Sequence, residues 1–256
     1  MAGGKGTRLA PLTNAVNKHL LPIFDKPMIY YPLTTLMLAG IREFGLITTP
    51  KDISQFQLLL SDGEKFGIEI TYIEQDKPLG IAEGISLSRN FIEKEKVALI
   101  LGDNIFHGIG LGRQLAKYTN IVGAQIFAYQ VRDPENYGVV EISASGEILS
   151  LDEKPSIPKS KFAIPGLYFY DNEVLSLIEN LQPSARGELE VTDLNREYFL
   201  KNRLKVSILS TGTSWLDTGT FNGLHDASSF IRIMEERQNS TIGDPIQAAR
   251  VQGWIK

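Results

Sequence analysis

Residues 97–104 read Val-Ala-Leu-Ile-Leu-Gly-Asp-Asn, and this stretch decides the fold class of the chain. Five consecutive apolar residues that end in a glycine and two polar residues are typical of a buried strand leading into a ligand-binding turn. On either side of it, short apolar runs alternate with amphipathic segments of helical length, which is the pattern of βαβ units. The sequence therefore predicts an α/β protein with a mostly parallel sheet flanked by helices.

In the second half of the chain, several strand-like segments follow one another in place of the alternation of strands and helices. Ser145-Gly146 joins two strand-like segments and indicates a β-hairpin, so we expect an antiparallel addition to the sheet. Since no repeat or linker interrupts the chain, we expect one domain with a nucleotide-binding front, residues 1–105, and a substrate-binding back, residues 106–256. The expected helices are 28–39, 54–60, 81–93, 172–181, 192–202 and 221–237, and the expected strands are 46–49, 68–74, 97–101, 125–131, 139–143, 148–152 and 204–209.

Composition excludes several classes of protein. The 256 residues carry 26 Lys and Arg against 30 Asp and Glu, so the basic footprint of a nucleic-acid-binding protein is lacking. No cysteine is present, which excludes disulfide scaffolds, thiolate zinc sites and cysteine nucleophiles. No apolar run reaches the roughly 20 residues of a membrane helix. We therefore expect a cytoplasmic protein with no nucleic-acid or membrane partner. Three scattered histidines, His19, His107 and His225, lack paired metal-ligand spacing.

Two segments are suited to phosphate and metal binding. Residues 2–9, Ala-Gly-Gly-Lys-Gly-Thr-Arg-Leu, combine bare backbone N–H groups with two cations, although the spacing is not that of a Walker A loop; the alternative is a disordered start. Asp103 follows the buried strand, where ligand crevices of α/β sheets lie, and a carboxylate there suits Mg²⁺. Asp217, in Trp-Leu-Asp-Thr-Gly, is a second candidate. For both aspartates the alternative is a capping role.

Two further polar segments carry weaker signals. Glu153-Lys154 would suit a hydroxyl group and a phosphate, but could equally be a solvated strand end. Arg186 lies in a polar connection and could reach an anionic ligand, although loop arginines usually serve solubility. Because there is no Gly-x-Ser-x-Gly elbow and only three histidines, a hydrolase nucleophile is disfavoured.

Taken together, these segments resemble the sugar-1-phosphate nucleotidylyltransferases, over nearly the whole chain. The resemblance implies a Rossmann-like mixed sheet with an added antiparallel sugar-binding part. It also implies Mg²⁺-dependent coupling of dTTP and glucose 1-phosphate to dTDP-glucose and pyrophosphate, by direct displacement, as the first step toward dTDP-rhamnose for cell-surface polysaccharide. A homotetramer is also implied. The motifs that carry the resemblance are residues 2–9, Lys-His-Leu-Leu-Pro at 18–22, Asp-Lys-Pro-Met-Ile-Tyr-Tyr-Pro at 25–32, Leu-Gly-Asp-Asn-Ile-Phe at 101–106, Tyr-Gly-Val-Val-Glu at 137–141 and Trp-Leu-Asp-Thr-Gly-Thr at 215–220.

The same resemblance assigns roles to individual residues. Arg8, Lys18, Asp103 and Lys154 are implied to be catalytic, and Asp103 with Asp217 would hold Mg²⁺. The implied nucleotide contacts are Gly3, Gly4, Gly6, Thr7, Arg8, Gln75, Gly80 and Asp103. The implied sugar-phosphate contacts are Asn104, Tyr137, Gly138, Glu153, Lys154 and Arg186.

The chain departs from the family pattern at several points. The family has a strand before the glycine loop, which this sequence lacks, and the C-terminal helical region is shorter than in the family's longer members. Single-residue departures are Asn17 for Ser, His19 for Gln, Leu79 for Asp and Glu83 for Gln. Two alternatives stay open: the same chemistry with UTP or another nucleotide, and a non-catalytic remnant that only binds nucleotide sugar.

Overall fold

The computed structural model describes residues 1–4 and 6–256, so Lys5 of the glycine loop lies outside the described part. Packing divides the chain into two compact units. The first unit comprises Met1–Pro78, Ile100–Ala116 and Gly212–Lys256, and the second comprises Leu79–Leu99 and Lys117–Thr211. The expected single domain, with its division at residue 105, stays a prediction.

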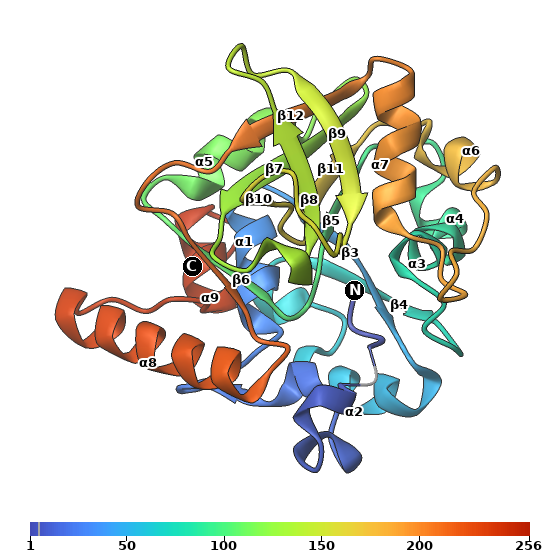
Figure 1. Cartoon of the computed structure of the whole chain (residues 1–256). Helices are drawn as coiled ribbons and strands as arrows, with labels where there is room; N and C mark the ends of the chain where they lie inside the picture. The colour runs from blue at the N-terminus through green and yellow to red at the C-terminus, as the bar shows by residue number, and fades with distance from the viewer. Residues whose placement is uncertain (5) are drawn as a thin grey trace. The chain divides into compact units, whose positions relative to one another are not determined.

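The first unit begins with the glycine loop and a series of short turns, followed by helices and two-stranded ladders (Figure 1). Its 3₁₀ turns are Thr7–Leu9, Leu12–Asn14, Lys18–Leu20 and Glu64–Phe66. Its helices are α1 (Tyr30–Leu38), α2 (Pro50–Leu60), α5 (Leu111–Leu115), α8 (Phe221–Gln238) and α9 (Pro245–Val251). Its strands are β1 (Pro22–Ile23), β2 (Lys26–Pro27), β3 (Glu43–Thr48), β4 (Glu69–Glu74), β6 (Asn104–His107) and β13 (Ser214–Asp217).

Strand β3 organises the start of the first unit. It pairs with β4 in parallel, from Glu43 opposite Glu69 to Thr48 opposite Glu74. Its carboxyl end also receives the start of the chain, because the Ala2 amide donates to the Ile47 carbonyl at 2.7 Å. Met1 continues this contact on its other side, since its carbonyl accepts from the Gly102 amide at 2.8 Å. The residues that lead into the glycine loop are therefore held between β3 and the turn that contains Asp103.

Helix α1 separates two apolar clusters of the first unit. Leu33 and Met37 pack into a cluster that includes Phe56 of α2. Tyr31 instead belongs to a cluster that contains Ile231 of α8. Because buried apolar residues lie on both sides of α1, the helix is covered almost all round, which explains its long run of apolar residues.

The second unit is built on a seven-stranded sheet with the order β5-β11-β7-β10-β8-β9, in which β12 also pairs with β7. Strand β12 is parallel to β7, whereas β10 and β11 are antiparallel to it, so the sheet is mixed. The strands are β5 (Val97–Ile100), β7 (Ala124–Gln130), β8 (Gly138–Ile142), β9 (Ile148–Glu153), β10 (Phe162–Ala163), β11 (Leu167–Tyr170) and β12 (Leu204–Ile208). The helices are α3 (Ile81–Leu87), α4 (Arg89–Ile92), α6 (Val174–Ile178) and α7 (Val191–Leu200), with 3₁₀ turns at Ala116–Tyr118 and Pro134–Asn136.

The expected elements are confirmed with small shifts at their ends. The hairpin around Ser145-Gly146 is the antiparallel pair of β8 and β9, and the α/β class is confirmed. The expected helix 81–93 is two helices, α3 and α4, which meet at Ser88. The Ser88 hydroxyl donates to the Gly84 carbonyl at 2.8 Å, a contact that competes with regular helical bonding. The sequence did not predict β6, β10, β11 or β13.

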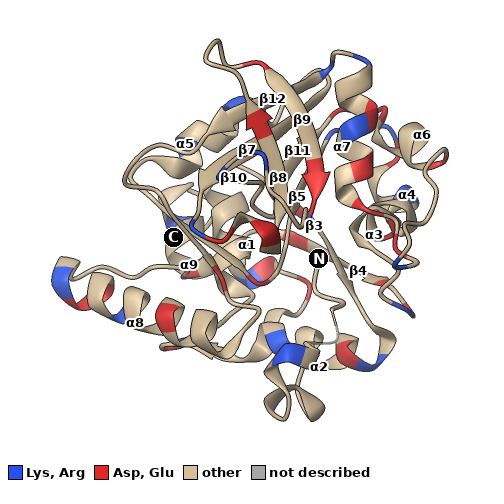
Figure 2. Ribbon diagram, in the orientation of Figure 1, with Lys and Arg blue, Asp and Glu red and all other residues tan. Residues whose placement is uncertain are grey.

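Charged residues of both signs occur along α8, and Figure 2 colours parts of its ribbon blue and red; they are Asp226, Arg232, Glu235, Glu236 and Arg237. Within the described residues, no helix combines the length and the apolar character that a membrane crossing requires.

Candidate active site

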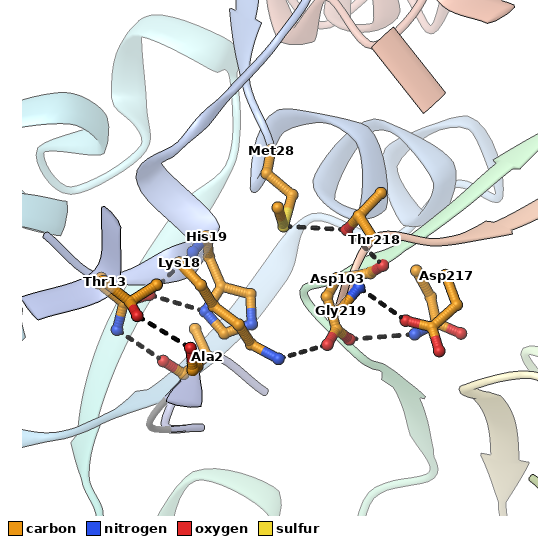
Figure 3. A network of polar contacts seen from close by, with 12 residues as sticks. Ala2, Thr13, Lys18, His19, Met28, Asp103, Asp217, Thr218 and Gly219 are labelled. Atoms are coloured by element: carbon orange, nitrogen blue, oxygen red, sulfur yellow. Dashed lines mark hydrogen bonds and ion pairs between the residues drawn. The ribbon is translucent and has the colours of Figure 1, made fainter. Parts of the chain in front are cut away.

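Asp103 and Asp217 come together because β6 and β13 pair. The two strands are antiparallel, with Asp217 opposite Asn104. Thr218 fixes the junction, since its amide and its hydroxyl both donate to the Asp103 carbonyl, at 3.0 and 2.8 Å. The 113 residues between the two aspartates are therefore closed by a short ladder, and Figure 3 shows the two side chains near Thr218.

Lys18 is the cation of this group. Its ammonium forms an ion pair with the Asp103 carboxylate, and each of the two side chains is only 12% exposed. The other Asp103 oxygen accepts from the Asn104 amide at 3.0 Å. Burial alone would raise the pKa of Asp103, but the Lys18 charge, the nearby His19 and the two hydrogen bonds outweigh it and hold that pKa well below its ordinary value. Asp103 is therefore ionised at neutral pH.

The pKa of Asp217 is shifted in the opposite direction, upward. Burial and the charge of Asp103 raise its pKa, while the Gly219 amide, Arg8 and Lys18 oppose the rise. The Gly219 amide donates to Asp217 Oδ1 at 2.9 Å. Burial and the neighbouring charge thus disfavour the ionised form of Asp217, and neighbouring carboxylates with opposite pKa shifts are often found at functional sites. We call Lys18, Asp103 and Asp217 the aspartate cluster.

The glycine loop reaches the aspartate cluster through Arg8 and Gly4. A Cβ on Gly219 would lie 2.9 Å from a terminal nitrogen of Arg8, so the Arg8 guanidinium rests against the turn that holds Asp217. A Cβ on Gly4 would lie 3.5 Å from the Lys18 ammonium. Gly6 has φ 62°, and its carbonyl accepts from the Thr13 hydroxyl at 2.8 Å. Thr7 and Arg8 follow in an exposed 3₁₀ turn.

Gln75 lies behind the glycine loop. It is 2% exposed, and its backbone amide donates to the Thr48 carbonyl at 2.9 Å. A Cβ on Gly3 would lie 2.8 Å from its amide oxygen. Because Gly3 has no side chain, Gln75, which the sequence predicts to contact the nucleotide base, can lie close to the glycine loop.

In the second unit, a second charged group forms around Glu153, at the end of β9. One oxygen of Glu153 accepts from the Thr192 hydroxyl at 2.5 Å, and the other pairs with Arg186 at 3.3 Å. Arg186 in turn pairs with the buried Glu190 at 2.9 Å, and Ser184 donates to the same Glu190 oxygen at 2.7 Å. Burial opposes the charge of Arg186, but the hydrogen bond and the charge of Glu190 raise its pKa. We call Glu153, Arg186, Glu190 and Thr192 the arginine cluster.

The remaining predicted residues of the second unit lie near this cluster or at the start of α3. Gly138 stands opposite Glu153 in the ladder, and a Cβ there would lie 3.2 Å from the Thr192 hydroxyl. Lys154 has a left-handed φ of 43°, its amide donates to the Tyr137 carbonyl at 3.0 Å, and its ammonium is 3.9 Å from Glu153. At Gly80, φ is 117° and a Cβ would lie 2.3 Å from the Leu189 carbonyl oxygen, so only glycine fits.

The predicted site residues therefore fall into two groups. The first unit brings together Gly3, Gly4, Gly6, Arg8, Lys18, Asp103, Asn104 and Asp217, with Thr7 and Gln75 on the same loop region. The second unit brings together Tyr137, Gly138, Glu153, Lys154 and Arg186, while Gly80 lies at the start of α3.

Sequence reasoning missed several polar residues that hold these groups in place, namely Thr218, Ser184, Glu190 and Thr192. No local pattern marks them, because each acts through a partner far along the chain or through a turn. Glu83, noted as a departure from the family pattern, accepts from the Leu79 amide at 3.1 Å and so helps to begin α3.

The donor set fits a hard divalent cation. Magnesium binds one or two carboxylates and completes its coordination with water and phosphate oxygens. The aspartate cluster supplies two carboxylates, one ionised and one whose pKa is raised by its neighbour. Among the described residues no group of three or more His, Asp or Glu side chains could hold a metal, so an all-protein cage is not formed there.

This fold and donor arrangement define a nucleotidyl-transferring enzyme, and the chain belongs to the nucleotidyl transferase family, whose model matches residues 1–233. Among its relatives is the glucose-1-phosphate thymidylyltransferase of Mycobacterium tuberculosis, which is 53% identical over 255 residues that cover 100% of this chain and 88% of the relative. The enzyme of the same name from Neisseria meningitidis is 49% identical over 258 residues, with 100% and 89% covered.

Solved structures agree with this assignment. A glucose-1-phosphate thymidylyltransferase structure from Bacillus anthracis, in complex with sucrose, has a TM-score of 0.86 at 37% identity and covers 96% of each chain. A UDP-glucose pyrophosphorylase complexed with UDP-glucose has a TM-score of 0.80 at 23% identity, with 91% of this chain covered and 97% of that one, and shows the fold alone. The predicted fold class and family are confirmed.

Proposed function

We infer that the chain catalyses the glucose-1-phosphate thymidylyltransferase reaction, in which dTTP and glucose 1-phosphate form dTDP-glucose and pyrophosphate. The inference is supported by relatives of that name at about half identity over the whole chain. On the structural side it is carried by one observation: a buried lysine and two carboxylates converge beside a glycine loop. The reaction transfers a nucleotidyl group without a covalent enzyme intermediate, so alignment and charge neutralisation suffice for catalysis.

In the first unit we assign triphosphate binding to the glycine loop. Gly3, Gly4 and Gly6 present bare backbone to the phosphates, with Thr7 beside them. Arg8 would balance the charge of the departing pyrophosphate, and Lys18 that of the reacting α-phosphate. Gln75 of the first unit and Gly80 of the second would contact the thymine ring.

Mg²⁺ is the cofactor that we propose for the aspartate cluster, with Asp103 and Asp217 as its protein ligands. When bound, the ion supplies positive charge to the phosphates and polarises them toward attack. Lys18 keeps Asp103 ionised before the metal arrives, because the ion pair lowers the pKa of that carboxyl. Asn104 holds the other Asp103 oxygen and so limits rotation of the carboxylate.

In the second unit we assign glucose 1-phosphate to the arginine cluster. Glu153 would accept hydrogen bonds from sugar hydroxyls, with Tyr137 and Gly138 as further sugar contacts in the same unit. Asn104, which belongs to the first unit, is a further proposed sugar contact. Lys154 and Arg186 would bind the phosphate of glucose 1-phosphate, which is the attacking group. Lys154 would also hold this phosphate in position during the attack. Arg186 suits this role because its guanidinium is held by Glu190 on one side and is 44% exposed, so a phosphate can reach it.

Product formation from dTTP, glucose 1-phosphate and MgCl₂, followed by chromatography with a no-metal control, tests the proposal. Metal-dependent dTDP-glucose is the expected result, whereas a folded sample that forms no product would overturn it. A parallel series with UTP and the other nucleotides tests base selection, for which we expect dTTP to give the highest kcat/KM. The tetrameric state, the cytoplasmic location and the role in dTDP-rhamnose synthesis stay predictions.

A further inference from the structure

The residues on either side of Lys18 are buried and polar, and they bond to each other. Asn17 and His19 are 6% and 2% exposed, whereas the rest of the segment before them, residues 10–16, is mostly exposed. His19 Nδ1 lies 2.7 Å from Asn17 Oδ1, which also accepts from the His19 backbone amide at 3.0 Å.

The orientation of the Asn17 amide follows from its other partners. Asn17 Nδ2 lies 2.8 Å from Asp52 Oδ2 and 3.1 Å from the Ala2 carbonyl, and both of these groups only accept. The nitrogen of the amide must therefore face Asp52 and Ala2, and its oxygen must face His19. The Thr49 hydroxyl completes the chain of contacts by donating to Asp52 Oδ2 at 2.7 Å.

This fixes the tautomer of His19. Because Asn17 Oδ1 can only accept, Nδ1 of the ring must carry hydrogen, and in the neutral ring Nε2 carries the lone pair. The Cδ2–Nε2 edge of the ring lies close to Gly102, the residue before Asp103, since a Cβ on Gly102 would be 2.6 Å from His19 Cδ2 and 3.0 Å from Nε2. Consecutive residues of one segment thus hold consecutive residues of another: Lys18 pairs with Asp103, and His19 packs on Gly102.

We propose that Asn17 and His19 are positioning residues, which use the Asp52 carboxylate on α2 as an anchor to fix the Lys18 ammonium against the Asp103 carboxylate. The proposal rests on the proposed function for its catalytic meaning, but the tautomer is a property of the protein alone. Asn17 links His19 to Asp52, because its amide donates to Asp52 and accepts from His19. Its amide does both with one planar group and without any change of protonation, as the longer side chain of glutamine also would.

The first test reads the tautomer directly. The chain has three histidines, so ¹⁵N imidazole NMR of the wild-type protein resolves each ring. We expect hydrogen on Nδ1 of His19, whereas the exposed His225 is the internal control and should show the ordinary preference of a solvated ring for hydrogen on Nε2. Hydrogen on Nε2 alone of His19 would overturn the proposal, whatever the protein catalyses.

The second test exchanges the two partners. In Asn17→Asp, two carboxylates face each other, so we expect kcat to fall by about tenfold to a hundredfold because of misplacement of Lys18. In the double variant Asn17→Asp with Asp52→Asn, the amide of residue 52 donates to the carboxylate of residue 17, which still accepts from His19 but no longer donates to the Ala2 carbonyl. We expect this exchange to raise kcat by about fivefold or more over Asn17→Asp without full recovery, as coupled partners do in a double-mutant cycle.

The two kinetic constants separate positioning from general damage. The arginine cluster has no residue in this network, so KM for glucose 1-phosphate should stay within about twofold in both variants. A double variant that folds but is no more active than Asn17→Asp would contradict the proposal. If Asn17→Asp alone does not fold, the NMR measurement of the His19 tautomer and the kcat of the double variant still test the proposal. Failure of the wild type to form dTDP-glucose would instead overturn the proposed function.

Discussion

The aspartate cluster of the first unit and the arginine cluster of the second unit are built in different ways. Lys18 and Asp103 are each 12% exposed, and backbone or side-chain donors hold Asp103 from several directions. Arg186 is 44% exposed and Glu153 is 25% exposed, and the two are paired mainly with each other and with Glu190. Buried ion pairs resist rearrangement, whereas exposed pairs contribute little and exchange readily with solvent. The aspartate cluster is therefore the more rigid of the two, and we expect the arginine cluster to be a binding surface whose internal pairs a ligand replaces.

The largest expected effect follows from removing the Asp103 charge. We expect Asp103→Asn to lower kcat by about 10²-fold to 10³-fold or more, the usual loss for one preorganised electrostatic group. Initial rates of dTDP-glucose formation at saturating substrates measure it. The variant leaves Lys18 without its partner, so its melting temperature should also fall. A wild-type kcat for Asp103→Asn would contradict the role that we assign to Asp103.

A change at Asp217 separates catalysis from stability. Its folded-state pKa is raised, so the stability from its neutral form is complete below the ordinary Asp pKa and is lost as pH rises through the raised value. Asp217→Asn cannot ionise and keeps that stability. We therefore expect the variant to have a higher melting temperature than the wild type at pH 7 without metal, by about 2 to 4 °C for each kcal/mol by which its free energy of unfolding increases. Near pH 3.5 the two proteins should melt at the same temperature.

Calorimetry across this pH range, with and without MgCl₂, checks the prediction. Metal should stabilise the wild type and leave Asp217→Asn nearly unchanged, while the kcat of the variant falls. Asp103→Asn serves as the matched control, because its melting temperature should change in the other direction. A lower melting temperature for both variants at pH 7 would show that the two carboxylates do not repel each other.

The two clusters also differ in how well the sequence predicted them. Gly-Asp-Asn after a buried strand marked Asp103, since the carboxyl ends of strands are where ligands bind. The partnership with Asp217 could not be derived, because it depends on the pairing of β6 and β13, two four-residue strands that no periodicity distinguishes. Glu190 and Thr192 were missed for a similar reason: their roles arise because the start of α7 lies against Glu153, at the end of β9, and against Arg186. Elements with a sustained period, such as α8 and the hairpin of β8 and β9, were predicted because their pattern is local.

Removing Arg186 should alter binding more than turnover. A hydrogen bond to a charged group is worth about 1.5 to 3 kcal/mol, so Arg186→Ala should raise KM for glucose 1-phosphate by about tenfold to a hundredfold. KM for dTTP should stay within about twofold, because the ion-pair partners of the guanidinium, Glu153 and Glu190, both belong to the arginine cluster. Arg89→Ala, which removes the exposed pair with Glu179, is the matched control and should leave both constants unchanged. Equal losses in the two KM values would place Arg186 outside the sugar-phosphate site.

The smallest effect that we predict concerns the hydroxyl of Thr192, which is 2% exposed and donates to Glu153 at 2.5 Å. Thr192→Val keeps the shape of the side chain and removes this donor. The loss of one such bond costs about 1 kcal/mol, so KM for glucose 1-phosphate should rise by about fivefold with little change in kcat. Thr192→Ser restores the hydroxyl and should return KM to within about twofold of the wild type. If serine and valine give the same KM, the carboxylate of Glu153 does not depend on Thr192, and the arginine cluster is held by Glu190 and Arg186 alone.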